Sequence, residues 1–184
     1  MHEQQMQPNE FGKVAVLMGG DSAEREISLM SGQAVLESLL RSGVDAVGVD
    51  EIDRTLLKRL HEENFDRVFI ILHGRKGEDG KVQGAMELMN LPYTGSGVLA
   101  SALAMDKVLC KRLWQNLGLN TPSFVELDKQ TNWQEVIDTL GTVFVKPVKE
   151  GSSIGISKAE SPEALAKAYS DARQYDDVVI AEQF

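Results

Sequence analysis

Three short apolar runs in the first half of the chain predict buried strands. Residues 13–18 (KVAVLM) and 67–72 (RVFIIL) are almost continuously apolar, which is typical of strands covered on both faces of a parallel sheet. Residues 45–49 form a shorter run of the same kind. Because parallel strands are joined by crossover connections, helices are expected between these runs.

The segments between the runs carry apolar residues at helical spacing. Residues 26–40 predict an amphipathic helix that ends near Gly43, and residues 54–63 predict a second one with three leucines. This order of strands and helices predicts an α/β domain with a doubly wound parallel sheet over residues 13–117. Further helices are expected in that range at residues 81–89, 98–105 and 106–117.

A different pattern follows residues 118–122, which contain glycine and proline and form the expected domain boundary. Residues 122–184 predict part of an α+β domain of roughly 60 residues, which is near the lower limit for a core that is stable alone. Ser161 is expected to cap a helix that has Pro162 at its first position. The other elements expected here are a strand at 123–127, a helix at 132–140, a hairpin from Thr142 and a strand at 178–181.

The hairpin from Thr142 contains the clearest candidate for a phosphate-binding loop. Its first strand ends at Lys146 and Pro147, and residues 149–155 (KEGSSIG) form a loop of small residues. Glycines allow close backbone approach, while free N–H groups and serine hydroxyls can donate to phosphate oxygens. The loop is not a P-loop, because no Gly-Lys-Ser/Thr precedes a helix, and a solvated turn is the alternative.

Two turns rich in glycine and charge follow the first and third predicted strands. Residues 19–26 (GGDSAERE) and 73–80 (HGRKGEDG) lie where open α/β sheets bind ligands, at the carboxyl ends of the strands. The first turn lacks G-x-G-x-x-G, so a dinucleotide site is not supported. Glu24 has the spacing of a capping box, and this role stands beside contact with a substrate. His73 is either a hydrogen-bonded structural histidine or a member of a site.

One lysine stands at an unfavourable place in a helix. Asp106 can cap the helix that follows it, but Lys107 in the first turn opposes the helix dipole. Lys107 is therefore expected either to be exposed or to lie near an anion.

Composition excludes several classes of protein. Of the 184 residues, 42% are hydrophobic and 26% charged, as in ordinary soluble domains. The net charge of −9 argues against nucleic acid or an anionic membrane as partner, and no apolar run reaches the ~18–20 residues of a spanning helix. Residues 1–12 are polar and are expected to be a flexible leader rather than a signal peptide. The single Cys110, expected in a helical core, fits a reducing compartment.

Five motifs together resemble the D-alanine–D-alanine ligase family of the ATP-grasp superfamily. In family order they are GGDSAEREIS at 19–28, HGR and GEDG within 73–80, PYTGS at 92–96, MDK at 105–107, and KP with EGSSIG within 146–155. Each motif is weak alone, whereas five in order are specific. The resemblance covers nearly the whole chain from Lys13. It implies a Rossmann-like, pre-ATP-grasp first domain followed by part of an ATP-grasp domain.

The resemblance also implies a role for individual residues. Glu24 would bind the ammonium of the first D-alanine and orient Ser152, and His73 would lie near that substrate's carboxylate. Lys107 and Lys146 would contact ATP phosphates, and Glu182 would lie on the adenine side. The loop residues implied to close over the nucleotide are Glu150, Gly151, Ser152, Ser153 and Gly155.

The reaction implied is an ADP-forming ligation of D-alanine to D-alanine through a D-alanyl phosphate, for peptidoglycan synthesis in the bacterial cytoplasm. Charge neutralisation and alignment dominate such phosphoryl transfer, which suits lysines, backbone N–H groups and Mg²⁺ or Mn²⁺. The family's metal ligands, a further arginine and a tyrosine loop are expected beyond Phe184, so the 184 residues alone are expected to show no turnover and weak ATP binding. Homodimers are common among enzymes of this resemblance.

Two alternatives stand beside this interpretation. Another ATP-grasp carboxylate–amine ligase would share the hairpin with Lys146 but would not need turns of this form at Glu24 and His73. A nucleotide- or amino-acid-binding module without catalysis would need no metal ligands.

Overall fold

The computed structural model describes residues 7–50 and 54–184 and divides the chain into two compact units, residues 1–102 and 103–184. The expected boundary at 118–122 therefore falls inside the second unit, because the helix that precedes it packs with the later strands. Residues 1–6 of the expected leader lie outside the described residues, whereas Pro8–Phe11 form the short 3-10 helix η1. No helix in the described ranges is long and apolar enough to span a bilayer.

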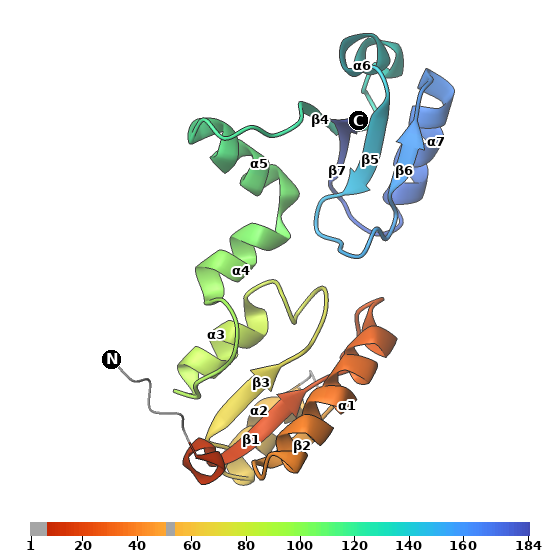
Figure 1. The fold of residues 1–184 in the computed structure, drawn as a ribbon. Coiled ribbons are helices and arrows are strands. Elements are labelled where there is room, and N and C mark those ends of the chain that lie inside the picture. The colour runs from red at the N-terminus through yellow and green to blue at the C-terminus, as the bar shows by residue number, and fades with distance from the viewer. Residues whose placement is uncertain (1–6, 51–53) are drawn as a thin grey trace. The chain divides into compact units, whose positions relative to one another are not determined.

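The first unit is built on a parallel sheet of three strands in the order β2-β1-β3 (Figure 1). The strands are β1 (Lys13–Leu17), β2 (Asp45–Val49) and β3 (Arg67–Ile70), as the apolar runs predict. Val14 lies opposite Ala46 on one side and Arg67 on the other.

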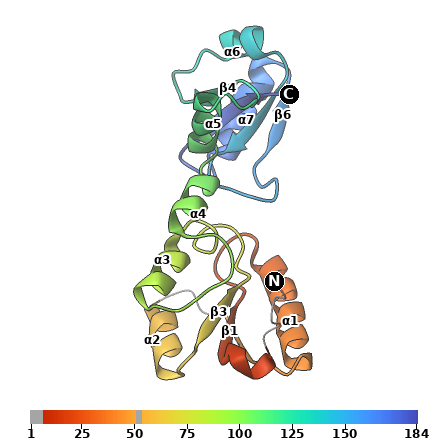
Figure 2. The ribbon, with the colours of Figure 1, turned by 60° about the vertical axis from the view of Figure 1, so that its left-hand side comes forward.

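Helices cover both faces of this sheet, which confirms the doubly wound prediction. Figure 2 shows α1 (Arg25–Arg41) on one side of the strands, with α2 (Arg54–Glu62) and α3 (Lys81–Leu88) on the other. Each helix presents its apolar side to the sheet, so alternate strand residues are buried on opposite faces: Val14 and Val16 beneath α1, Ala15 and Leu17 beneath α2 and α3. The helix α4 (Val98–Met105) follows.

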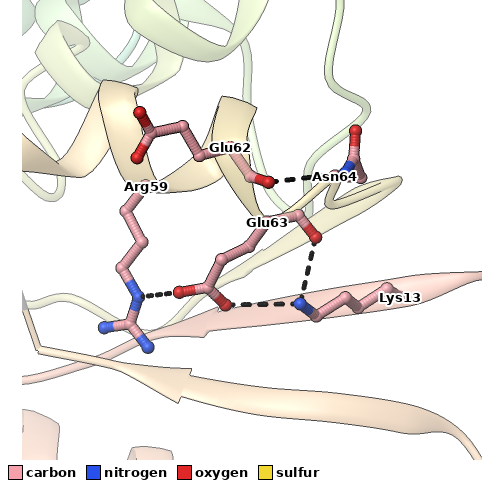
Figure 3. A network of polar contacts seen from close by, with 5 residues as sticks. All are labelled: Lys13, Arg59, Glu62, Glu63 and Asn64. Atoms are coloured by element: carbon pink, nitrogen blue, oxygen red, sulfur yellow. Dashed lines mark hydrogen bonds and ion pairs between the residues drawn. The ribbon is translucent and has the colours of Figure 1, made fainter.

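A polar network joins the start of β1 to the end of α2 (Figure 3). Lys13 Nζ donates to the backbone oxygen of Glu63 at 3.0 Å and pairs with its carboxylate at 3.3 Å. Arg59 Nε donates to the other carboxylate oxygen at 2.8 Å, while Asn64 closes the turn on the Glu62 carbonyl. The network fixes the connection between α2 and the sheet at the amino end of β1, whereas the turns at residues 19–26 and 73–80 lie at the carboxyl ends of the strands.

The second unit is an antiparallel sheet in the order β4-β7-β5-β6. The expected hairpin is present as β5 (Val143–Pro147) and β6 (Ser157–Ala159), and the other strands are β4 (Phe124–Leu127) and β7 (Val179–Gln183). Within β5, Val143 and Val145 are fully buried while Phe144 and Lys146 are not.

The two faces of this sheet have different cover. The Val143 and Val145 face forms a core with α6 (Trp133–Leu140) and α7 (Pro162–Ala172). The other face meets α5 (Lys107–Asn116) through a cluster of Val108, Val148 and Ile180. The helix caps expected at Asp106 and Ser161 are both formed, each accepting a backbone N–H.

The expectation for Cys110 is confirmed in part. It is a free thiol on α5 and donates to the Leu103 carbonyl at 3.1 Å, but it is half-buried rather than in the core. Burial and the nearby Asp106 carboxylate raise the pKa of this thiol, which opposes nucleophilic behaviour.

Candidate functional site

The first candidate site begins at the turn after β1. Ser28, which is fully buried, accepts from the Gly19 N–H at 2.9 Å and donates to the Ile71 carbonyl at 2.7 Å. Gly19 and Gly20 both have φ of +79°, a conformation that glycine adopts without steric cost. The turn is thereby tied to the end of β3.

A bidentate ion pair fixes the same turn from its other side. The Arg25 guanidinium contacts the two Asp50 carboxylate oxygens at 2.6 and 2.5 Å and donates to the Gly20 carbonyl at 2.7 Å. Asp50 also accepts from the Gly20 N–H at 3.2 Å. The Arg25 hydrogen bond keeps the pKa of Asp50 below its ordinary value, so the pair is ionised at neutral pH.

Glu24 does not act as the capping residue that its spacing allows. It occupies the N-cap position before α1, yet its side chain makes no capping hydrogen bond there, so of the two roles that the sequence left open the capping role is not formed. The side chain turns inward instead, and the residue is only 7% exposed. A Cβ built on Gly74 would lie 2.9 Å from Glu24 Oε2, which places this carboxylate directly against the turn after β3.

His73 lies beside that contact. Its backbone oxygen accepts from Ser22 Oγ at 2.8 Å, and the same hydroxyl accepts from the Glu24 N–H at 3.2 Å. His73 Nε2 is buried and is one of two buried side-chain atoms in the described ranges without a hydrogen-bond partner. The structure thus places Glu24 and His73 at the same turn, linked through the Ser22 hydroxyl, and leaves a ring nitrogen for a polar ligand.

The second candidate site lies on the α5 side of the antiparallel sheet. Lys146 on β5 pairs with Oε1 of Glu182 on β7, the diagonal neighbour of its position in the sheet. Lys111 on α5 contacts Oε2 of the same carboxylate at 2.7 Å. Burial opposes the ionisation of Glu182, but hydrogen bonds from both lysines outweigh it and lower the pKa of the carboxyl.

Lys107 belongs to this second group. Its ammonium donates to the carbonyls of Val148, at 3.2 Å, and of Glu150. These two hydrogen bonds compensate for the unfavourable position of a positive charge at the start of a helix. Partial burial and the neighbouring charge of Lys146 lower the pKa of Lys107. Two ammonium groups and a loop backbone therefore converge, as an anion site requires.

The loop after β5 has an unusual backbone. Ser152 and Ser153 both have positive φ, at 48° and 62°, which non-glycine residues adopt rarely and at a cost. Gly155, at φ +67°, is packed so closely that a Cβ would lie 2.7 Å from the Tyr175 ring and 2.8 Å from Pro147. The two serines are exposed at the tip.

The site residues expected from sequence thus form two groups. Glu24 and His73 lie at the same turn in the first unit, whereas Lys107, Lys146, Glu150 and Glu182 share one face in the second. The proposed orientation of Ser152 by Glu24 joins residues of different units and stays a prediction. Ser28 and Lys111 were missed. For Lys111 the available signal was a lysine on the buried side of a helix, three residues after Val108.

Two other features lie apart from these groups. An apolar cavity of about 320 Å³ opens at the amino ends of the first unit's strands, lined by residues such as Phe11, Val14 and Arg67, and so lies away from Glu24 and His73. Within residues 7–50 and 54–184, no three His, Cys, Asp or Glu side chains gather as a metal site.

A parallel three-stranded sheet followed by a separate antiparallel sheet makes this an α/β protein, and this architecture matches that of solved D-alanine–D-alanine ligases. The chain matches the family descriptions "D-ala D-ala ligase N-terminus" over residues 50–96 and "D-ala D-ala ligase C-terminus" over residues 113–184. The chain belongs to the D-alanine–D-alanine ligase family.

Individual relatives support the same family assignment. The chain is 57% identical to a D-alanine–D-alanine ligase of Nitrosomonas eutropha and 55% identical to that of Nitrosomonas europaea, each over 97% of its length. It spans 58% and 59% of those relatives. A solved D-alanine–D-alanine ligase of Bacillus anthracis matches with a TM-score of 0.83 at 30% identity, over 94% of this chain and 57% of that one. The same enzyme solved with ATP matches with a TM-score of 0.79 at the same identity and 58% of its length.

Proposed function

We propose that this chain serves the ATP-dependent ligation of two D-alanine molecules to D-alanyl-D-alanine, an ADP-forming carboxylate–amine ligation that supplies peptidoglycan synthesis. The observation that carries the proposal is that the Glu24 carboxylate lies against Gly74, next in the chain to His73, whose Nε2 is buried and has no hydrogen-bond partner among the described residues. An inward carboxylate suits an ammonium, and a neighbouring ring nitrogen suits a carboxylate. Together they complement an α-amino acid.

The second group of residues suits the other substrate, ATP. Lys107 and Lys146 bring two positive charges beside the backbone of the 150–155 loop, and both can donate to phosphate oxygens. Glu182 lies between Lys146 and Lys111, where it can meet the base of the nucleotide. The exposed serines at the tip can close over the phosphates and exclude water from the acyl phosphate.

The reaction proposed has two steps. A carboxylate oxygen of the first D-alanine bonds to the γ-phosphorus while the bond from that phosphorus to the bridging oxygen of ADP breaks. The amine of the second D-alanine then attacks the acyl carbon and loses a proton, and phosphate leaves. His73 and Glu24 would hold the first substrate, with Ser152 oriented by Glu24, and the lysines would neutralise the transferred charge.

Mg²⁺ or Mn²⁺ is proposed as the metal of the nucleotide from the family alone. The described residues do not by themselves fit a metal site, so we assign no step to a metal. The setting proposed is the bacterial cytoplasm, with a homodimer as the assembly. Light scattering after size exclusion tests the dimer.

The test is a turnover assay on the protein as its gene encodes it, with ATP, magnesium and D-alanine, reading phosphate release together with dipeptide. We expect both products with D-alanine and neither with L-alanine. Phosphate release with a different amino acid would indicate another ATP-grasp ligase. ATP binding without any phosphate release would indicate a binding module, and either result would overturn the proposal.

A further inference from the structure

Lys111 is a buried cation that neither the sequence motifs nor the proposed reaction assigns. Lys111 is only 3% exposed, and a lysine is rarely buried to this extent unless it has a partner. The ammonium lies 2.7 Å from Glu182 Oε2 and 2.7 Å from Thr121 Oγ1, to which it donates, and 5.3 Å from the centre of the Phe124 ring. Lys111 is thus enclosed and has no open side for a ligand.

The partner that Lys111 holds is also the partner of Lys146. One carboxylate oxygen of Glu182 faces each lysine, and the two lysines differ in access to water. The Lys146 side chain is 19% exposed, whereas that of Lys111 is 3% exposed. Lys146 can therefore leave Glu182 for an incoming anion, while Lys111 cannot.

The departure of Lys146 would be costly if it left Glu182 alone. Glu182 is 16% exposed, and an unpaired carboxylate in such a place is strongly unfavourable. A second, permanent ammonium on Glu182 removes that cost, because the carboxylate keeps a partner whether Lys146 is present or not.

We infer that Lys111 is a positioning residue of the nucleotide site: it holds the Glu182 carboxylate and balances its charge, so that Lys146 is free to contact a phosphate. This inference rests on the proposed assignment of Lys146 and Glu182 to ATP. A merely structural tie between α5 and β7 would stabilise the fold without acting on Lys146.

The test is a double-mutant cycle on ATP affinity, measured by calorimetry on the protein as its gene encodes it. Lys111→Met keeps the apolar stem and removes the charge, so Lys146 becomes the sole ammonium on Glu182. We expect ATP binding to weaken about tenfold, the effect of one charge-assisted hydrogen bond. In the Glu182→Gln background the same change should alter affinity less than about twofold, since no carboxylate then retains Lys146.

A matched control and a second readout separate this role from a loss of stability. Lys167→Met removes an exposed lysine of the same unit, which pairs with Asp171 one turn along its helix, and should leave ATP affinity unchanged. Carbon NMR of the Glu182 carboxylate should show its pKa rising in Lys111→Met. If that variant does not fold, Thr121→Val removes the hydroxyl bonded to Lys111 and should weaken binding about twofold to threefold.

The outcomes are distinct. Absence of ATP binding by the unmodified protein would overturn the proposed nucleotide site itself. Normal binding with no loss in Lys111→Met, or with an equal loss in both backgrounds, would overturn the role of Lys111 alone.

Discussion

Arg25 forms a bidentate ion pair with Asp50 through two contacts of 2.6 and 2.5 Å, and the same guanidinium donates a hydrogen bond to the carbonyl of Gly20. The pair thus joins the start of α1 and the end of β2 to the turn that carries Glu24. We expect Asp50→Ala to raise the KM for D-alanine several-fold, because Glu24 then loses its fixed position. Steady-state kinetics with D-alanine as the variable substrate measure the effect. An unchanged KM would show that the contacts left in the variant, those of Ser28 and of Arg25 with the Gly20 carbonyl, hold the turn without the ion pair.

Glu24 is expected to recognise substrate by its charge. Because its side chain makes no capping bond, Glu24→Gln removes charge without removing a cap. The kcat/KM for D-alanine should fall by about tenfold or more, as for a lost charge-assisted hydrogen bond, while the melting temperature barely changes. A variant that loses thermal stability but keeps its kinetics would return Glu24 to a structural role.

Lys146 is expected to contact a phosphate of ATP. Its charge partner in the structure is Glu182 on the neighbouring strand, so the lysine is placed but can exchange partners. Lys146→Met should raise the KM for ATP or lower kcat by about tenfold or more, since a charge-assisted bond contributes ~1.5–3 kcal/mol. Lys167→Met serves as the control with a lysine that is exposed on α7. Equal ATP kinetics in both variants would rule out this role.

Gly155 is expected to be needed for the shape of the loop. A methyl group there would lie 2.7 Å from the Tyr175 ring and 2.8 Å from Pro147, at a φ of +67°. Gly155→Ala should therefore lower the melting temperature and raise the KM for ATP. Gly141 offers a matched control, because it has a φ of +69° but open space where a Cβ would be added. If Gly141→Ala is as harmful as Gly155→Ala, the backbone alone, and not the packing, sets the effect.

The network around Glu63 predicts a pH-dependent contribution to stability. Hydrogen bonds from Arg59 and then Lys13 hold the pKa of Glu63 below its ordinary value (Figure 3). A lowered folded-state pKa gives stability that is present above the unfolded-state pKa of about 4.3 and is lost as pH falls through the folded-state value. Glu63→Gln should therefore melt below the unmodified protein near pH 7, with the difference vanishing at low pH. Thermal melts from pH 3 to 7 measure this difference, and a constant difference would contradict it.

Local patterns predicted the elements of this fold because each has a nearby cause. Residues 13–18 and 67–72 are apolar on both sides and form β1 and β3, and Ser161 with Pro162 starts α7 as a cap and a first-turn proline should. The same reasoning left the role of Glu24 open between capping and substrate contact, because the spacing of a capping box says nothing of a glycine turn 50 residues later against which the carboxylate lies.

Contacts between distant segments of the chain could not be predicted from the sequence for the same reason. Lys111 meets Glu182 across 71 positions, and only the packing of α5 on the sheet brings them together. The division of the chain also depends on that packing, since Val108 joins the core of the later strands rather than that of the earlier ones.

The alternation along β5 has a consequence for how this segment can change in length. Val143 and Val145 face the helices α6 and α7, while Phe144 and Lys146 lie on the other side of the strand, where Lys146 pairs with Glu182. Deleting one residue between Val143 and Lys146 would shift Lys146 to the buried side of the strand, so the ammonium would enter the apolar core and Pro147 would take its position in the sheet. Deleting two residues preserves the parity of the strand. Deleting an odd number of residues from β5 would therefore abolish the contact between Lys146 and Glu182 even if every other side chain were kept. Deleting an even number would leave Lys146 on the same side of the strand.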